Sequence, residues 1–383
     1  MRHGIAGSVA LGIAILADTG GARAQALSTP AIAGPLAGNP NPLSLDAGPL
    51  GKIDLSGVVS GLALWQDNSV PGDRALRADI GNGQVVVQKA DGLLQFYVQA
   101  GAYSLPALGT PYLSAGHTIA DTFGAVPVAY AKLVPTGSFS IEAGKLPTLI
   151  GDEYTFTFQN MNIERGLLWN QEPAISRGVQ ANYSSGPFTL ALSWNDGFYS
   201  DRLNWLSGSL AYTIDSADSV TFVGGGNVGH TGYSSFATPL AQNDGNIFNL
   251  IYTWTSGPWT ASPYVQYANV PADIAPAIAH NAATTGGAVL VSYAIDADWK
   301  LAGRAEYISS SGNSAVGTPN LLYGPGSDAW SLTVTPTWQH GIVFARADAS
   351  YVGVGHAAAG FAFGAHLDRS SQFRLMLETG VLI

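Results

Sequence analysis

The feature that most constrains this chain is an alternation of apolar and polar residues that recurs along nearly its whole length. In the clearest stretch, Trp330, Leu332, Val334, Pro336 and Trp338 alternate with Ser331, Thr333, Thr335 and Thr337. Successive side chains of a β-strand point to opposite faces, so such a stretch predicts a strand with one apolar and one polar face. Repeated stretches joined alternately by tiny turns and long polar loops are typical of a membrane-spanning β-barrel.

Turn residues divide the sequence into about sixteen such stretches. We expect strands at 52–66, 79–90, 93–104, 121–135, 138–147, 174–185, 187–197, 203–214, 218–229, 245–256, 258–269, 285–296, 298–309, 328–339, 341–353 and 371–383. Bacterial barrels have even strand numbers, short periplasmic turns and long extracellular loops. An even count places every short turn and both ends of the barrel on one side. We therefore predict that residues 51–383 form an all-β, antiparallel transmembrane barrel of about sixteen strands.

The composition removes the main competing classes. No apolar run of about eighteen residues lies beyond the N-terminus, which excludes a helical membrane protein. Backbone polar groups in lipid must all be paired, which leaves a closed sheet. With no cysteine and only 11% charged residues, the chain offers no disulfide framework and differs from an ordinary soluble enzyme.

Tryptophan positions give an independent argument for a membrane barrel. Four lie near short turns (Trp254, Trp259, Trp299, Trp338) and four near long loops (Trp65, Trp194, Trp205, Trp330). The amphipathic indole is most stable at a membrane interface, so we expect two aromatic girdles. A soluble β-sandwich, the alternative, would bury these residues in the middle of its strands.

The N-terminus has the features of an export signal. A basic start precedes an apolar run over residues 5–17, and Ala22-Arg23-Ala24 is an A-x-A cleavage site. We expect a signal peptide at 1–24, cleaved before Gln25, and export to the bacterial outer membrane. A membrane anchor is excluded because the apolar run is too short. Residues 25–50, rich in Pro, Gly and Ala, are expected to form a flexible periplasmic lead with no packed role.

The net charge and the positions of the histidines limit which partners and activities we expect. Removal of the signal peptide leaves 14 basic and 25 acidic residues, a net charge of −11, which argues against nucleic acid. The remaining histidines are scattered, with none at a catalytic or metal-binding spacing. We expect no enzyme activity, cofactor or metal. The expected partners are outer-membrane lipid and lipopolysaccharide, small hydrophilic solutes or ions, and further copies of the chain.

Segment 148–173 is the least regular part of the chain, and a family resemblance is centred on it. The residues that carry it are Gly144-Lys145-Leu146, Glu153-Tyr154, Asn160, Asn162, Arg165, Glu172-Pro173, Gly178-Val179 and Trp194-Asn195-Asp196-Gly197. By these residues the chain resembles the outer-membrane β-barrel porin family called OmpL-like. The resemblance covers most of the mature chain. Only the central third matches in specific residues, and the flanking parts match in their pattern of hairpins. The chain departs from the usual pattern by ending at Ile383 instead of an aromatic residue.

The resemblance implies a role for segment 148–173, because a loop of this kind narrows the lumen of general porins. The candidate constriction residues are Asp152, Glu153, Glu164, Arg165, Trp169 and Glu172. The alternative is an outer loop that covers the barrel rim, with its charges solvated or bridging lipopolysaccharide through divalent cations. The sequence leaves both possibilities open.

Strand parity predicts a second charged cluster. If the apolar residues of the late strands face outward, the lumen wall receives Lys300, Arg304, Glu306, Arg346, Asp348, Arg374 and Glu378. A basic wall opposite an acidic loop would create a transverse field that filters solutes by charge. Alternatively, mutually paired Arg and Glu only hold the wall rigid.

A barrel of sixteen strands leaves an aqueous channel, whereas eight strands are filled by side chains. We therefore expect a porin for passive diffusion of small hydrophilic solutes, with a weak cation preference from the acidic loop. Aromatic and amide residues leave a sugar preference open (Tyr154, Phe156, Gln159, Asn160 and Trp169). The second hypothesis is a non-transporting barrel that acts as an adhesin, receptor or structural anchor through its outer loops.

Overall fold

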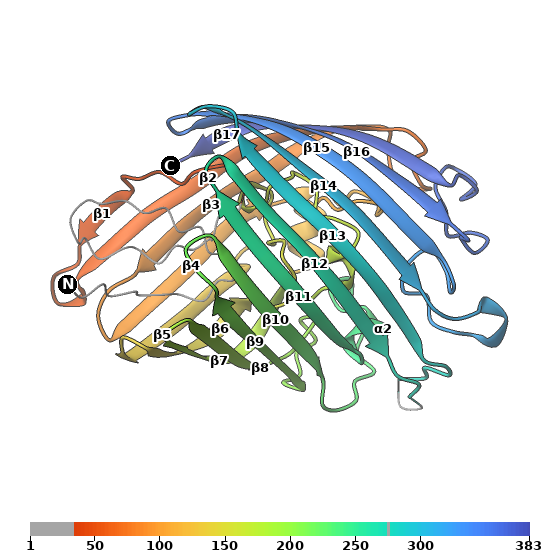
Figure 1. Cartoon of the computed structure of the whole chain (residues 1–383), viewed down its shortest axis with the longest axis horizontal. Helices are drawn as coiled ribbons and strands as arrows, with labels where there is room; N and C mark the ends of the chain where they lie inside the picture. Colours follow the sequence, from red (N-terminus) through yellow and green to blue (C-terminus); the bar gives the residue numbers. More distant parts are fainter. Residues whose placement is uncertain (1–33, 274–275) are drawn as a thin grey trace.

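The computed structural model describes residues 34–273 and 276–383, and in it the chain forms one closed antiparallel barrel (Figure 1). Strands β2 to β17 each pair with the next, and β17 pairs back with β2 from Leu382–Val58 to Arg374–Gln66. The predicted sixteen-stranded barrel is thereby confirmed. The expected signal peptide lies outside the described residues.

The barrel strands are β2 (Lys52–Gln66), β3 (Leu76–Lys89), β4 (Leu94–Tyr103), β5 (Val128–Thr136), β6 (Phe139–Pro147), β7 (Ile175–Ser185), β8 (Phe188–Asn195), β9 (Trp205–Thr213), β10 (Asp218–Asn227), β11 (Asn246–Ser256), β12 (Trp259–Val270), β13 (Ala282–Ala294), β14 (Trp299–Ser310), β15 (Asp328–His340), β16 (Val343–Gly355) and β17 (Ser371–Leu382). Strand β1 (Leu43–Asp46) pairs with the start of β2. The helices are α1 (Ala115–Asp121) and α2 (Leu240–Asn243), with 3-10 turns η1 (Gly48–Leu50), η2 (Thr157–Gln159), η3 (Trp169–Gln171) and η4 (Ser314–Val316). No described helix is long and apolar enough to cross a membrane.

Alternation along each strand sorts side chains between the two faces of the wall. On β15, Trp330, Leu332 and Val334 are 42–53% exposed on the outer face. The intervening Ser331 and Thr333 are almost fully buried toward the lumen. The apolar outer face fits contact with hydrocarbon, as the sequence pattern predicts.

One predicted strand begins later than expected. Residues 121–135 were expected to be extended, but β5 starts at Val128 and α1 occupies Ala115–Asp121. Gly124 adopts a positive φ of 74°, and Pro127 has no backbone N–H to donate. These two residues delay the strand until the chain has left the turn.

The girdle prediction is wrong at Trp205. Trp65, Trp194, Trp259, Trp299 and Trp330 are 42–52% exposed on the outer face, and Trp254 and Trp338 are half-buried. Trp205 is instead fully buried, and its Nε1 donates to the carbonyl of Asn243 at 2.6 Å. Leu206 and Leu210 are the outward residues of β9, so the odd-numbered Trp205 must point inward.

The expectation of a flexible lead at 25–50 is wrong for residues 34–50. Strand β1 pairs with β2 from Leu43–Leu55 to Asp46–Lys52. Leu36 is only 3% exposed. The first strand of the barrel extends past β17 and leaves a free edge, on which β1 completes the backbone hydrogen bonds.

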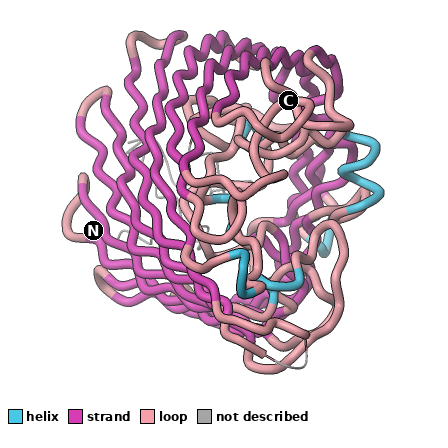
Figure 2. The backbone as a smooth tube through the Cα atoms, turned by 90° about the vertical axis from the view of Figure 1, so that its right-hand side faces the viewer, coloured by secondary structure: helices cyan, strands magenta, loops and turns pink. Residues whose placement is uncertain are grey.

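Loop segments occupy the interior of the barrel, as Figure 2 shows inside the ring of strands. Two buried apolar clusters join these segments to the wall. The first contains Leu149, Ile150 and Leu168 together with Trp205, Val223, Ile247, Ile251 and Tyr264, among others. The second contains Phe156 and Phe158 together with Leu36, Tyr97, Tyr103, Leu146 and Phe344, among others. The barrel core therefore lies where the inner loops meet the strands.

Candidate pore constriction

Segment 148–173 folds into the lumen as a compact loop, hereafter the inner loop. It leaves the end of β6 and turns at η2. Asn160 holds the turn closed, since its Oδ1 accepts from the Tyr154 N–H at 2.7 Å and its Nδ2 donates to the carbonyls of Tyr154 and Phe156 at 2.8 Å. An asparagine side chain mimics a backbone turn in this way. Asn160, one of the residues that carry the family resemblance, thus stabilises the turn of the inner loop.

Arginines of the lumen wall donate to backbone carbonyls of the inner loop. Arg346 donates to Thr157 at 3.0 Å, to Asn160 at 2.8 Å and to Met161 at 2.9 Å. Arg304 donates to the Glu164 carbonyl at 2.7 Å. The planar fork of a guanidinium serves several acceptors at once, so these arginines fix both the position and the direction of the loop backbone.

Carboxylates of the same wall accept from backbone N–H groups of the loop. Asp348 accepts from Ile163 at 2.9 Å and from Glu164 at 3.2 Å. Glu306 accepts from Leu167 at 3.0 Å. Loop donors and acceptors that would otherwise be buried without partners are thereby satisfied.

Buried ion pairs add to this contact. Arg304 pairs with Glu153 of the loop at 2.5 Å and with Glu306 of its own strand at 3.2 Å. Arg374 pairs with Glu164 at 2.9 Å. A buried charge is tolerated only when it is paired and hydrogen-bonded, and these five groups meet that condition through each other.

These contacts combine six predicted lumen-wall residues into one surface, which we call the charged wall. It consists of Arg304, Glu306, Arg346, Asp348, Arg374 and Glu378 on β14, β16 and β17. The sequence leaves two roles open for these residues: an electric field across a water-filled lumen, or ion pairs within the wall that hold it rigid. The structure gives it a further role, because its charges bind the inner loop. Lys300 stands apart, with Nζ donating to the carbonyl of Pro35.

The opposite side of the inner loop meets an apolar surface, which we call the apolar flank. It consists of Trp205, Val223, Ile247, Ile251 and Tyr264 on β9 to β12. Two polar contacts cross it: the Gly151 N–H donates to Asn249 at 3.3 Å, and Gln266 donates to the Leu168 carbonyl at 3.0 Å. The inner loop therefore contacts the barrel on both sides, one charged and one mainly apolar.

The side chains of two charged residues of the inner loop have no hydrogen-bond partner within the described part of the chain. The Arg165 guanidinium is fully buried, and its carbon lies 4.9 Å from the centre of the Trp169 ring. The Glu172 carboxylate is 5% exposed. Burial raises the pKa of Glu172 well above its ordinary value. Burial also raises the pKa of Asp152, to about 6, with Ser262 nearby opposing the shift.

A second loop, residues 104–114, packs against the inner loop and is not predicted from the sequence. The Leu108 N–H donates to the Arg165 carbonyl at 2.9 Å, and the Arg165 N–H donates to the Pro106 carbonyl at 3.1 Å. Arg374 donates to the Ala107 carbonyl at 2.9 Å. This segment has no charge and no alternation, so nothing in its sequence distinguishes it from an outer loop.

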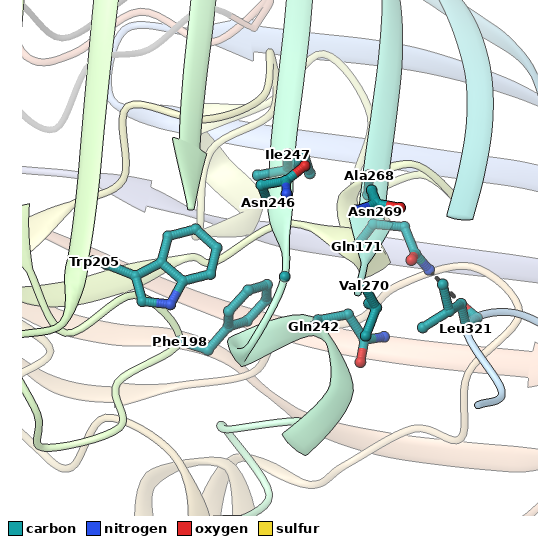
Figure 3. Close-up of a pocket in the computed structure, with 11 residues that line it drawn as sticks. Gln171, Phe198, Trp205, Gln242, Asn246, Ile247, Ala268, Asn269, Val270 and Leu321 are labelled. Carbon is teal, nitrogen blue, oxygen red and sulfur yellow. Dashed lines mark hydrogen bonds between the residues drawn. The ribbon is translucent and has the colours of Figure 1, made fainter. Parts of the chain in front are cut away.

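A small pocket lies at the long-loop end of the apolar flank (Figure 3). Its lining combines amides and rings, among them Gln171, Gln242, Asn269, Phe198 and Trp205. Its volume of about 10 Å³ is room for about one water molecule, so it is too small for a solute. Among the described residues, no group of three or more His, Cys, Asp or Glu is placed to hold a metal ion.

Comparison with known proteins assigns the chain to a family. Residues 52–383 match the model of the family described as "Putative beta-barrel porin-2, OmpL-like". The chain belongs to this family. The match confirms the resemblance and identifies the protein as a porin-type channel of the outer membrane. No curated protein matches the chain.

Solved structures agree at the level of the fold. OmpT, an outer-membrane protein of Vibrio cholerae, has a TM-score of 0.58 at 13% identity, covering 90% of this chain and 100% of its own. The outer-membrane channel DcaP of Acinetobacter baumannii has 0.58 at 11%, covering 86% and 97%. Salmonella typhi OmpF, solved with daunomycin, has 0.57 at 12%, covering 89% and 100%.

Proposed function

We propose that this porin passes small hydrophilic solutes by passive diffusion, with the inner loop as its constriction. The observation that carries the proposal is the position of this loop, held by the charged wall inside a sixteen-stranded barrel. A loop fixed by directional contacts narrows the lumen to a constant size. Such a constriction sorts solutes by size and charge without any chemical step.

The proposed constriction residues have different roles. Glu153 and Glu164 are paired with wall arginines, so their charge is largely compensated and serves to hold the loop. Within residues 34–273 and 276–383, Asp152 forms no ion pair with an arginine, and the residue is partly exposed. We therefore assign a modest cation preference to Asp152. Trp169 lies against the Arg165 guanidinium and stabilises this buried cation by a cation–π contact.

Assembly with further copies of the chain is part of the proposal. OmpT of Vibrio cholerae has been solved in a trimer form. The same barrel architecture and an apolar outer face would allow this chain to associate in the membrane. We also propose that the chain has no enzyme activity, in keeping with its family.

A second candidate function is a non-transporting barrel that acts as an adhesin, receptor or structural anchor. The observation that favours it is the dense packing of the inner loop. Ile150, Phe156 and Leu168 are at most 1% exposed and bridge the lumen to both sides of the wall. A barrel filled in this way would conduct only after the loop had moved.

Single-channel recording in a planar bilayer separates the two functions. The purified mature protein should give stable conductance steps, and liposomes that contain it should swell in isosmotic solutions of small sugars but not of large ones. A silent bilayer, together with folded protein on a gel, would contradict diffusion and favour the non-transporting barrel.

A further inference from the structure

Residues 34–42, which we call the N-terminal arm, contact the lumen contents as well as the wall. The Gly34 N–H donates to the carbonyl of Gln159 at 3.1 Å, at the turn of the inner loop. Ala37 and Gln339 form a reciprocal pair, with both N–H···O distances at 2.8 Å. Lys300 donates to the Pro35 carbonyl. The arm thus connects the tip of the inner loop to β14 and β15.

The arm also has an apolar anchor. Leu36 is 3% exposed and belongs to the cluster that contains Phe158 of the inner loop, Val58 of β2 and Phe344 of β16. Burial of a leucine side chain contributes about 1.5–3 kcal/mol. This contact fixes the arm by a particular side chain, in addition to its backbone hydrogen bonds.

Gly34 marks the closest approach between the arm and the inner loop. A Cβ at this position would lie 2.1 Å from the Asn160 carbonyl oxygen, well inside contact distance. Asn160 is also held by Arg346. Any side chain at residue 34 must therefore displace the arm from the loop, since the loop is fixed on its other side.

The outer end of the arm is fixed independently. Strand β1 follows it directly and pairs with β2, and Ser44 Oγ donates to Asp54 at 2.5 Å. The arm is therefore held at both ends, at the barrel rim by β1 and inside the lumen by the loop tip. A segment held at both ends occupies a defined part of the cross-section.

We propose that the N-terminal arm is a second constriction element, which narrows the pore beneath the inner loop at the short-turn end. Gly34 and Leu36 are the residues that set its position. The effect of the arm on transport rests on the proposed diffusion function, whereas its position inside the barrel is independent of that function.

The location is tested first, by cysteine labelling. The chain has no cysteine, so single-cysteine variants give an unambiguous signal. Leu36→Cys in the mature protein should resist a bulky maleimide until the barrel is denatured. The matched control is Leu43→Cys on β1, since Leu43 is 64% exposed and should react at once. Equal reaction at both positions would overturn the proposal, whether or not the protein conducts.

The role in the pore is tested by conductance. Gly34→Leu and Leu36→Asp should each raise single-channel conductance, because both displace the arm. Leu43→Asp should leave it unchanged. Altered gel mobility of the unheated variants shows that the barrel is folded.

The outcomes separate the two proposals. If the wild type conducts and the arm variants conduct equally well, the arm proposal is wrong and the diffusion proposal stands. If the wild type is silent and the arm variants conduct, the arm closes the pore and the proposal is supported in its strongest form. If neither conducts, diffusion fails, and the role of the arm in transport fails with it.

Discussion

The two sides of the inner loop are held by opposite kinds of interaction. The charged wall binds it through directional contacts, as between Arg346 and three backbone carbonyls. The apolar flank contacts it mainly by apolar packing, since Ile150 of the loop and Tyr264 of the flank belong to one buried cluster. Directional contacts fix position and orientation, whereas apolar contacts have no preferred direction. We therefore expect the loop to separate from the apolar flank before it separates from the charged wall.

The largest effect is expected at the charged wall, from Arg304→Ala. The change leaves Glu153 and Glu306 buried without their cation, which costs about 3–5 kcal/mol. The inner loop should leave its position, and single-channel conductance should become larger and noisier. Arg304→Lys is the matched control, which keeps the charge but loses the fork and should be intermediate. Wild-type conductance in Arg304→Ala would mean that this wall does not hold the loop.

A smaller effect is expected at the apolar flank, from Ile150→Ala. Ile150 is 1% exposed and contacts β10. Its Cδ1 is so close to Gly225 that a Cβ added to this glycine would lie only 2.9 Å away. Removal of its buried methyl groups lowers the free energy of unfolding by about 2–5 kcal/mol. We expect a value near the lower end, because water from the lumen can enter the space that the methyl groups leave. Protease cleavage within the loop should become faster, while the conductance increase stays below that of Arg304→Ala. The reverse order would contradict the comparison.

The third prediction concerns pH. Burial raises the pKa of Asp152 to about 6, so this carboxyl is charged above that pH and neutral below it. Cation preference, measured as the zero-current potential in a salt gradient, should fall as the pH is lowered from 8 to 5. Asp152→Asn should reduce this dependence, and the part that remains belongs to Glu153, because burial also raises the pKa of that carboxyl, to about 7. Glu153→Gln should instead disturb the loop, because Glu153 is the partner of Arg304.

The smallest effect is expected on the outer face of β15, the strand between β14 and β16, from Trp338→Asp. Trp338 lies near the end of β15 and pairs with Trp299. A charge on the lipid face costs about 0–1 kcal/mol near the interface. The yield of folded protein in the membrane should fall slightly, with unchanged conductance of the molecules that insert. A changed conductance would mean that outer-face substitutions reach the lumen.

The sequence could predict part of the constriction. Strand parity predicts that Arg304 faces the lumen, and the family resemblance makes Glu153 and Glu164 candidate constriction residues, but the sequence leaves open whether their loop enters the lumen. Their pairing was not predicted, because Glu153 and Arg304 are 151 positions apart and meet only when the barrel closes. The second loop and the N-terminal arm were missed, since a segment of Gly, Pro and Ala has the same composition inside a lumen as outside it.

By itself, the sequence determined the wall of this protein. Strand number, order and facing follow from a period of two along the chain and from short turns, which are local properties. Trp205 is the exception. Its position near a long loop predicts a place at the membrane interface, but its neighbour Leu206 faces outward, so Trp205 faces the lumen. The tertiary structure alone decided what fills the barrel. The contents of a lumen depend on its width and on contacts between distant strands, neither of which a local pattern records.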